Sequence, residues 1–328
     1  MKLLQFFRTR NVLALMTGAL LSGACLANSF PSKPLRIYVP NPPGGGGDTI
    51  ARLVGGKLAE RLGQTVVIEN KPGGSSVIST DAVAKAEPDG HTLAFITDTH
   101  SINPVANANL PYDSIRDFAP VAQLIRGDYI LVASHKSGIR DLQDLIAKAK
   151  AQPGRFSYGS TGIGSVHHLA MELMSQKAGI KLAHVPYKGV AQAMADVLPG
   201  HIDLVLSGTA GGVVPAVSAG KLTGLGVTGA SRVAAVPDVP TFAQAGLPQF
   251  DSSFWFGFVA PAKTPPDVVE RLNREIIAVL KSDEVAAKLA GYGMKAAPPL
   301  SPAEFREFMI EDAKRYKDLI ESTGTKLD

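Results

Sequence analysis

Cysteine is nearly absent from this chain of 328 residues: Cys25 is the only one, so an intramolecular disulfide is excluded. The sequence also has no His-Glu-x-x-His motif and no closely spaced pair of cysteines, so the common zinc-binding patterns are missing. Aromatic residues make up 6% of the chain, which gives little support to a surface that stacks on sugars or nucleic-acid bases. We therefore expect a protein without a metal site or a cofactor.

The residue patterns that accompany catalysis are missing as well. Ser160 and Ser165 lie in glycine-rich stretches, but neither has glycine both two residues before and two residues after it, as a nucleophile elbow requires. His167 and His168 are neighbours on a predicted helix, so their side chains diverge and cannot readily ligate one ion. Binding is favoured over catalysis, and an exported hydrolase that uses Ser160 or Ser165 is a minor alternative.

No apolar run reaches the length that crosses a membrane, which is about 20 residues. The start of the chain instead combines the basic residues Lys2, Arg8 and Arg10 with a short apolar stretch, Val12 to Leu21, and small residues that lead to Ala27. This arrangement is typical of a secretory signal peptide, and we expect residues 1–27 to be removed.

Cys25 permits a second interpretation, a lipoprotein signal in which this cysteine carries the lipid. Ser22 stands where the lipoprotein motif normally has leucine, which disfavours that alternative. Cleavage after Ala27 leaves a mature chain without cysteine. An exported protein without disulfides fits the bacterial periplasm better than a small secreted scaffold that depends on disulfides.

Neither basic nor acidic residues are in large excess. The chain has 33 basic and 29 acidic residues, and the signal segment holds three of the basic ones and none of the acidic ones. The mature chain therefore has 30 basic and 29 acidic residues, a net charge of +1. The basic residues are scattered, so nucleic acid is not an expected partner.

The stretch Pro40–Asp48 has the sequence PNPPGGGGD and lies between an apolar run, Leu35–Val39, and a helical pattern. We expect a strand, a glycine loop and a helix whose N-cap is Asp48. The uncovered amides of such a loop can hold a small anion, although a plain flexible turn is an open alternative. The Gly-Lys-Ser/Thr ending of a P-loop is missing, and the glycine spacing does not match a dinucleotide fingerprint.

Strands and helices are predicted to alternate along the chain, which is the pattern of an α/β fold with parallel sheets. Thr97 ends the third strand at the edge that carries the glycine loop, and residues 103–118 are predicted to be irregular. The predicted strands are 35–39, 65–69, 92–96, 130–134, 181–185, 202–206, 222–227 and 254–260. The predicted helices include 76–86, 141–151 and 166–178.

Residues 156–165 repeat the arrangement of the first glycine loop. A short strand leads into glycines and hydroxyl residues, and a helix follows from Val166. About 300 mature residues exceed the usual size of a single core, so two lobes are expected. The two helix N-termini, one in each lobe, are then placed to face each other across a cleft.

The last part of the chain returns to the first lobe. The aromatic segment Phe254–Phe256 is predicted to form core and lobe interface rather than a stacking platform. Ser301-Pro302-Ala303-Glu304 has the pattern of a capping box with proline at the first helical position. The helix that follows is expected to pack against the first lobe, and no chemistry is assigned to it.

The chain resembles the Bug receptors, the periplasmic solute-binding components of tripartite tricarboxylate transporters. The resemblance begins with PLRIYVPNPPGGGGDTIAR at residues 34–52 and spans essentially the whole mature chain. Further matching segments, in order, are ENKPGG (69–74), PDGHTL (88–93), PYD (111–113), DFAP (117–120), VPYKG (185–189), AGKL (219–222), PDVPT (237–241) and WFG (255–257).

The resemblance implies a two-lobed periplasmic binding protein of type II, in which each lobe is a mainly parallel sheet flanked by helices. Lobe 1 would comprise residues 28–130 and 254–328, and lobe 2 residues 131–253. The protein is expected to be a monomer that closes on its ligand.

The resemblance also implies which residues hold a small carboxylate, mainly through backbone amides, hydroxyls and water. The loop of lobe 1 would hold one carboxylate, hydroxyls of lobe 2 the opposite end, and three further residues the sides. Two positions depart from the family pattern, because Asn41 replaces a usual aromatic and Ser207-Gly208 replaces a frequent acidic residue. The implied binding residues are Asn41, Pro42, Pro43, Gly44, Gly45, Asp48, Thr97, Ser160, Thr161, Ser165, Lys188, Gly189 and Ser207.

A function follows from the resemblance. The protein is expected to capture a mono-, di- or tricarboxylate and to deliver it to the membrane permease subunits of a tripartite transporter. A ligand sensor that docks on a two-component sensor kinase is the alternative, and the sequence does not separate the two.

Overall fold

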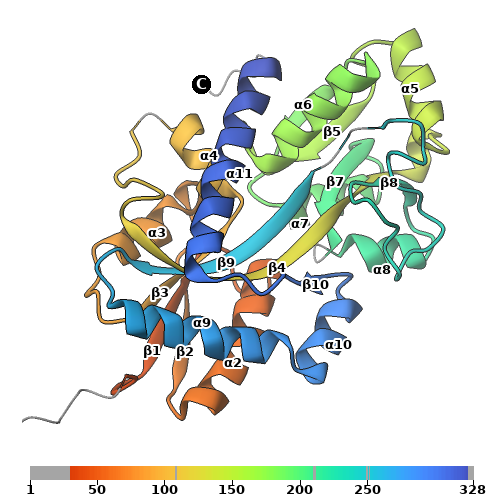
Figure 1. Cartoon of the computed structure of the whole chain (residues 1–328). Coiled ribbons are helices and arrows are strands. Elements are labelled where there is room, and N and C mark those ends of the chain that lie inside the picture. Colours follow the sequence, from red (N-terminus) through yellow and green to blue (C-terminus); the bar gives the residue numbers. More distant parts are fainter. Residues whose placement is uncertain (1–29, 108, 210–211, 249, 251, 324–328) are drawn as a thin grey trace, which may run out of the picture.

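The structure is a computed structural model that describes residues 30–107, 109–209, 212–248, 250 and 252–323 (Figure 1). The predicted signal peptide and Cys25 lie outside these residues. Within them, no helix has both the length and the apolar character needed to cross a membrane.

The described strands form one curved mixed sheet that runs through both lobes (Figure 1). Its order is β2-β1-β3-β9-β4-β7-β5-β6, and β8 and β10 each pair with β4. Parallel pairs lie toward both ends, whereas β9 and β4 are antiparallel to their neighbours. The bounds are β1 Leu35–Val39, β2 Val66–Asn70, β3 Thr92–Thr97, β4 Phe118–Ala133, β5 Ser157–Ser160, β6 Ala183–Pro186, β7 Leu204–Gly208, β8 Thr223–Val227, β9 Ser253–Pro261 and β10 Lys295–Ala296.

Helices flank the sheet and follow most strands of its parallel parts (Figure 1). The α-helices are α2 Gly46–Leu62, α3 Val77–Ala84, α4 Thr99–Ala106, α5 Leu142–Ala151, α6 Val166–Ala178, α7 Val190–Val197, α8 Val213–Ser218, α9 Pro266–Leu280, α10 Asp283–Gly291 and α11 Pro302–Thr323. Two short 3₁₀ turns cover Gly74–Ser76 and His135–Ser137. The predicted α/β fold is confirmed.

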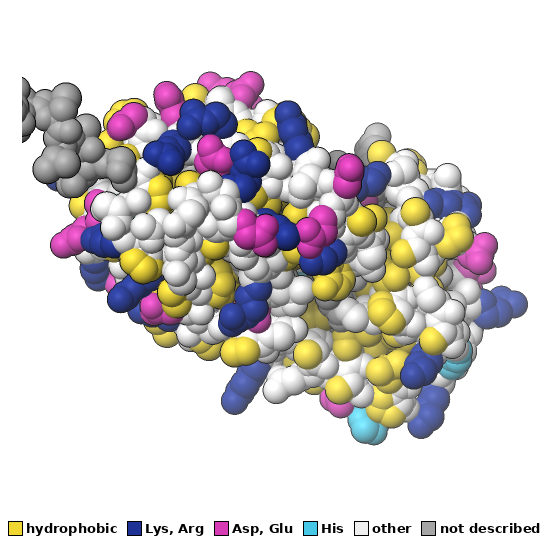
Figure 2. All heavy atoms as spheres, turned by 90° about the horizontal axis from the view of Figure 1, so that it is seen from below, with side chains coloured by type: hydrophobic (Ala, Val, Ile, Leu, Met, Phe, Trp, Pro, Cys, Tyr) yellow, Lys and Arg dark blue, Asp and Glu magenta, His cyan; other side chains and the backbone are white. Residues whose placement is uncertain are grey.

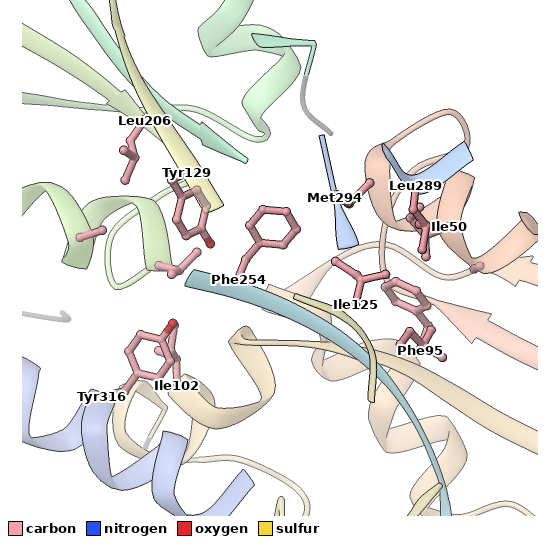
Figure 3. Packing of buried hydrophobic residues seen from close by; sticks show 14 of the residues in the cluster. Ile50, Phe95, Ile102, Ile125, Tyr129, Leu206, Phe254, Leu289, Met294 and Tyr316 are labelled. Carbon is pink, nitrogen blue, oxygen red and sulfur yellow. The ribbon is translucent and has the colours of Figure 1, made fainter. Parts of the chain in front are cut away.

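Strand β4 joins the two lobes. Its first part, up to Asp128, pairs with β9, and its last part, from Tyr129, pairs with β7 and β8. Buried side chains from both parts belong to one apolar cluster, in which Tyr129 and Leu206 lie on one side of Phe254 and Ile125 and Phe95 on the other (Figure 3). The lobes are therefore connected by packed core as well as by backbone.

Close packing at the crossing of β4 and β9 depends on glycine. A Cβ added at Gly127 would lie 2.3 Å from Cζ of Phe254, and one at Gly208 would lie 3.0 Å from its Cε1. The Phe254 ring is only 4% exposed, so it has little room to move away. Glycine thus lets the aromatic ring lie directly on the neighbouring strands.

Replacing Gly127 by alanine is expected to lower the free energy of unfolding by about 1–3 kcal/mol, the usual cost of overpacking. Gly56→Ala is the matched control, because Gly56 is inside α2 and has open space around its added Cβ. That change is expected to raise stability by about 0.5–1 kcal/mol. Urea denaturation of the two variants measures both values, and equal effects at the two positions would contradict the packing argument.

Several sequence-based boundaries were wrong for identifiable reasons. Strand β4 begins twelve residues before the predicted position 130, because charged and glycine residues at 126–128 interrupt its apolar run. Helix α4 forms partly in the stretch predicted to be irregular, and the Asp98 side chain accepts from the Thr99 N–H at its start. Strand β2 begins one residue after the predicted position 65, and it is half-exposed because it is an edge strand.

Helix α11 begins with the predicted capping box. The Ser301 N–H and hydroxyl donate to the Glu304 carboxylate over 2.8 and 2.7 Å, and the Glu304 N–H donates back to the Ser301 hydroxyl over 3.2 Å. The helix packs on α4 and β4, as predicted, but it also reaches α6 of the second lobe, where Gln176 Nε2 donates to the Ser322 carbonyl. The prediction that it contacts the first lobe was therefore incomplete.

The capping box makes a local prediction. Ser301→Ala removes the hydroxyl that holds the Glu304 N–H, and we expect it to lower the free energy of unfolding by about 1 kcal/mol. Ser301→Asp should retain most of the stability, because aspartate is an equally good N-cap. Thermal denaturation of both variants tests this, and identical losses would show that the cap contributes nothing specific.

Candidate functional site: two glycine loops joined by aromatic rings

The first glycine loop is held by Asp48 from inside the helix. Helix α2 begins at Gly46, with Gly45 as its N-cap, so the prediction that Asp48 is the N-cap was wrong. Asp48 lies in the first turn, where its carboxylate accepts from the Gly44 N–H at 2.9 Å. It reaches back to the loop from the third helical position, as the acidic residue of a capping box does.

The Asp48 carboxylate also accepts hydrogen bonds from side chains of neighbouring elements. Arg52 Nε donates to its Oδ2 over 3.0 Å, and Asn70 Nδ2 donates to its Oδ1 and to the Asn41 carbonyl, each over 2.8 Å. Burial alone would raise the pKa of Asp48, but the bonds from Arg52, Asn70 and Gly44 lower it below its ordinary value. The carboxylate is therefore an ionised structural centre that fixes the loop.

The remaining loop residues leave backbone amides at the helix start. The first bond of α2 runs from the Thr49 N–H to the Gly45 carbonyl, so the N–H groups of Gly46 and Gly47 come before the intrahelical ladder. Gly44 has φ of 80°, and a Cβ there would meet nothing within 4 Å. Pro42 accepts from the Gly45 N–H at 3.1 Å, and Pro43 is exposed. Such a helix start favours an anion.

Asn41 covers the loop from inside. Its side-chain Oδ1 would lie 2.0 Å from a Cβ on Gly47, which explains why glycine is needed there. A small cavity of about 40 Å³ lies between Gly44, Gly46 and Thr49 on one side and Tyr292 and Met294 on the other. It has room for water.

The second glycine loop follows β5 and leads into α6. Helix α6 begins at Val166 with Ser165 as its N-cap, whose hydroxyl accepts from the His168 N–H at 3.3 Å. The amides of Val166 and His167 come before the first intrahelical bond, from the Leu169 N–H to the Ser165 carbonyl. The helix predicted from 166 to 178 is confirmed.

Histidines that the sequence did not assign hold the hydroxyls of this loop. Ser160 is 2% exposed, and its Oγ lies 2.6 Å from His184 Nε2 and accepts from the Gly162 N–H at 3.0 Å. Thr161 Oγ1 lies 3.1 Å from Nδ1 of His167. The predicted hydroxyls are thus brought together, but Ser160 is turned inward.

The other predicted site residues are dispersed around these loops. Thr97 is 8% exposed, and its hydroxyl accepts from the Thr99 N–H at 3.2 Å. Gly189 is the N-cap of α7, and Lys188 beside it is exposed. Ser207 is fully buried, with its hydroxyl donating to the Gly208 carbonyl at 3.1 Å.

A row of rings connects the two loops. At one end Phe95 lies against Gly47, where an added Cβ would be 3.1 Å from Cε1 of the ring. At the other end the row reaches His167, next to Thr161. Successive ring centroids are 5.0, 5.4, 5.3 and 5.4 Å apart in the order Phe95, Phe256, Phe254, Tyr129 and His167. The prediction that the Phe254 segment forms core at the lobe interface is confirmed.

A buried polar cluster lies beside the row. The Tyr129 hydroxyl donates to Asp98 Oδ2 over 2.8 Å, and Asp98 is 4% exposed. Burial is the main cause that raises the pKa of Asp98 to about 7; nearby Asp312 adds to it. Sequence reasoning missed Tyr129 and Asp98, because a tyrosine in a strand and an aspartate at a turn carry no signal of their pairing.

The described residues on the face shown in Figure 2 form no large area of charge of one sign. On the face in Figure 2, Lys and Arg side chains are interspersed with Asp and Glu, and hydrophobic side chains gather in a hollow toward one end. No group of three or more His, Cys, Asp and Glu suited to a metal ion occurs in the described part of the chain. The geometry offers amides and hydroxyls at two helix starts, which is chemistry for binding an anion.

Comparison with known proteins agrees with this chemistry. The family model of the tripartite tricarboxylate transporter family receptor matches residues 50–325. Protein BugT of Bordetella pertussis is 34% identical over 307 residues, which cover 92% of each chain.

Two solved structures of similar proteins contain a bound ligand. The chain is similar to R. palustris Rpa4515 with adipate, at 31% identity and a TM-score of 0.84, covering 90% of this chain and 98% of the other. It is also similar to MatC of Rhodopseudomonas palustris with bound malate, at 30% identity and a TM-score of 0.81, covering 89% and 100%. The family consists of solute-binding receptors and not of enzymes. From its two-lobed fold and the match over most of its length, this chain belongs to the tripartite tricarboxylate transporter receptor family.

Proposed function

We propose that this protein is a periplasmic receptor that binds a small carboxylate between its two glycine loops and delivers it to the permease of a tripartite transporter. The observation that carries the proposal is the pair of helix starts, at α2 and α6, whose leading amides precede the first intrahelical bonds. They lie at opposite ends of one row of rings, so each side of the lobe junction carries one helix start that favours an anion.

Electrostatics supports an anion at each end. A helix N-terminus presents N–H groups and a partial positive charge, which favour a carboxylate without any arginine. Asp48 is saturated by donors, so its negative charge is compensated locally by Arg52. The relatives solved with adipate and malate show that receptors of this family take dicarboxylates of different polarity.

The lobe boundaries fit the same proposal. We place lobe 1 at residues 28–130 and 254–328 and lobe 2 at 131–253. In support, β4 changes its partners from β9 to β7 and β8 between Asp128 and Tyr129, two residues before this boundary. Ligand binding then draws the loop of lobe 1 and the loop of lobe 2 together about this crossing. Export depends on the predicted signal peptide at residues 1–27.

Calorimetry with adipate, malate, citrate and monocarboxylates tests the binding part. At least one carboxylate is expected to bind with a sub-millimolar Kd. The diamide of that ligand, which has the same shape without the charges, is the matched control and is expected to bind at least tenfold more weakly. A folded protein that binds none of these carboxylates would contradict the proposal.

A further inference from the structure

Three histidines surround the second glycine loop, and each uses one ring nitrogen to hold a different part of it. His184 Nε2 lies 2.6 Å from Ser160 Oγ, and the Gly164 N–H donates to Nδ1 of His168 over 3.1 Å. The His168 and His184 rings stack with centroids 4.1 Å apart, so these two form one packed unit. His167 is separate from that unit and contacts Thr161.

Thr161 is the hydroxyl of this loop that remains available. The Ser160 hydroxyl is buried and surrounded by His184 and both polar groups of Gly162. Ser165 is used as the helix cap. Thr161 is only partly buried and has a single side-chain contact of hydrogen-bond length in the described structure, to His167 Nδ1 at 3.1 Å.

The direction of this one hydrogen bond decides what Thr161 can do. A hydroxyl has one proton, and a carboxylate only accepts. If Thr161 donates to Nδ1, its proton is consumed and its lone pairs face the ligand, which repels a carboxylate oxygen. If Nδ1 carries the hydrogen and donates to Thr161, the hydroxyl proton is free to donate to the ligand.

The His167 ring is neutral, so the nitrogen that carries its hydrogen sets the direction of the bond to Thr161. Burial lowers the pKa of His167 to about 4, so the imidazole is uncharged at neutral pH and one nitrogen carries the hydrogen. The edge-to-face contact with Tyr129, at 5.4 Å and 74°, fixes the ring plane. The Tyr129 hydroxyl donates to Asp98 of the first lobe, so the Tyr129 ring that contacts His167 is held in place at the lobe junction.

We propose that His167 is a positioning residue for ligand recognition: its Nδ1–H tautomer turns the hydroxyl proton of Thr161 toward the ligand carboxylate. The inference rests on the proposed carboxylate function and specifies how lobe 2 recognises one end of the ligand. The specificity that results is for a group that only accepts, because an amide or hydroxyl at that end gains less from an oriented donor.

The direct test is nitrogen-15 NMR of the histidine side chains in the wild-type protein, because long-range couplings distinguish the two neutral tautomers. In the presence of a saturating carboxylate, adipate first and malate second, His167 is expected as the Nδ1–H form. A bound complex in which His167 stays in the Nε2–H form would overturn the inference. This readout needs no substitution and so does not depend on a variant that folds.

Variants supply the second measurement. His167→Leu removes the donor and is expected to raise Kd about tenfold, which corresponds to about 1.4 kcal/mol. His167→Asn places an amide N–H near the position of Nδ1 and is expected to bind within about threefold of wild type. His201→Leu, at an exposed histidine paired with Asp196, is the control and should leave Kd unchanged.

The outcomes separate the two proposals. A wild-type protein that binds no carboxylate contradicts the proposed function, and the inference falls with it. A wild-type protein that binds normally, with a His167→Leu variant that is folded and binds equally well, overturns the role of His167 alone.

Discussion

Asp48→Ala is expected to lower the free energy of unfolding by about 2–4 kcal/mol and to weaken carboxylate binding at least tenfold. The substitution removes the acceptor for Gly44 N–H, Asn70 Nδ2 and the Arg52 guanidinium at once. Breaking a buried charged network leaves its partners unpaired, which costs several kcal/mol, although Arg52 is half-exposed and regains water. The loop then loses the bond that aims its amides.

Glu321→Ala is the matched control for this prediction. Lys317 and Glu321 form an ion pair with the same four-residue spacing as Asp48 and Arg52, but both side chains are mostly exposed, at 61% and 64%. Exposed pairs of this kind contribute about 0.5 kcal/mol or less. Urea denaturation and calorimetry of both variants provide the comparison, and a folded Asp48→Ala protein with unchanged affinity would show that the loop does not hold the ligand.

Asp98→Asn is expected to make the protein more stable than wild type at neutral pH, with a gap that grows as the pH rises. Burial raises the pKa of Asp98 from its ordinary value of 3.8 to about 7 in the folded protein. The folded chain therefore keeps a proton that the unfolded chain releases near pH 3.8. The stability that Asp98 contributes is complete below that pH and is lost as the pH rises toward 7.

The surrounding groups set the size of this effect. Tyr129 and the Thr99 N–H donate to Asp98, and Arg315 favours its ionised form, whereas Asp312 opposes ionisation. The stability difference between variant and wild type should increase by about 1 kcal/mol per pH unit between pH 4 and 7. Asp267→Asn, at an exposed site in α9, is the control substitution. If the free energy of unfolding changed with pH in parallel for Asp98→Asn and wild type, Asp98 would be ionised in the folded protein over the whole range from pH 4 to 7. That result would contradict the prediction.

Local patterns were enough to predict the elements that carry the two loops. The apolar run 35–39, the four glycines and the helical spacing after them give β1, the first loop and α2. Helix α6 was predicted with its observed bounds, because its apolar residues at helical spacing after the second glycine loop are a local signal. The cap position of α2 was wrong, since glycine at 46 and 47 gives no side-chain signal for where a helix begins.

What the sequence could not supply are contacts between distant residues. Ser160 and His184 are 24 residues apart, and Tyr129 and Asp98 are 31 apart, so neither pair forms a motif. Strand β4 was predicted short because Gly127 reads as a turn residue, whereas its true role is to admit the Phe254 ring. The resemblance to a family predicts that these two loops bind the ligand, and the structure adds how each loop is held.

The most direct test of the central claim is a crystal structure of the protein purified without refolding, or soaked with the carboxylate that binds best. We expect one carboxylate end within hydrogen-bond reach of the amides of Gly46 and Gly47, directly or through water. We expect the opposite end at Thr161 and the start of α6. A ligand that contacts neither loop, or that lies wholly within one lobe, would contradict the central claim.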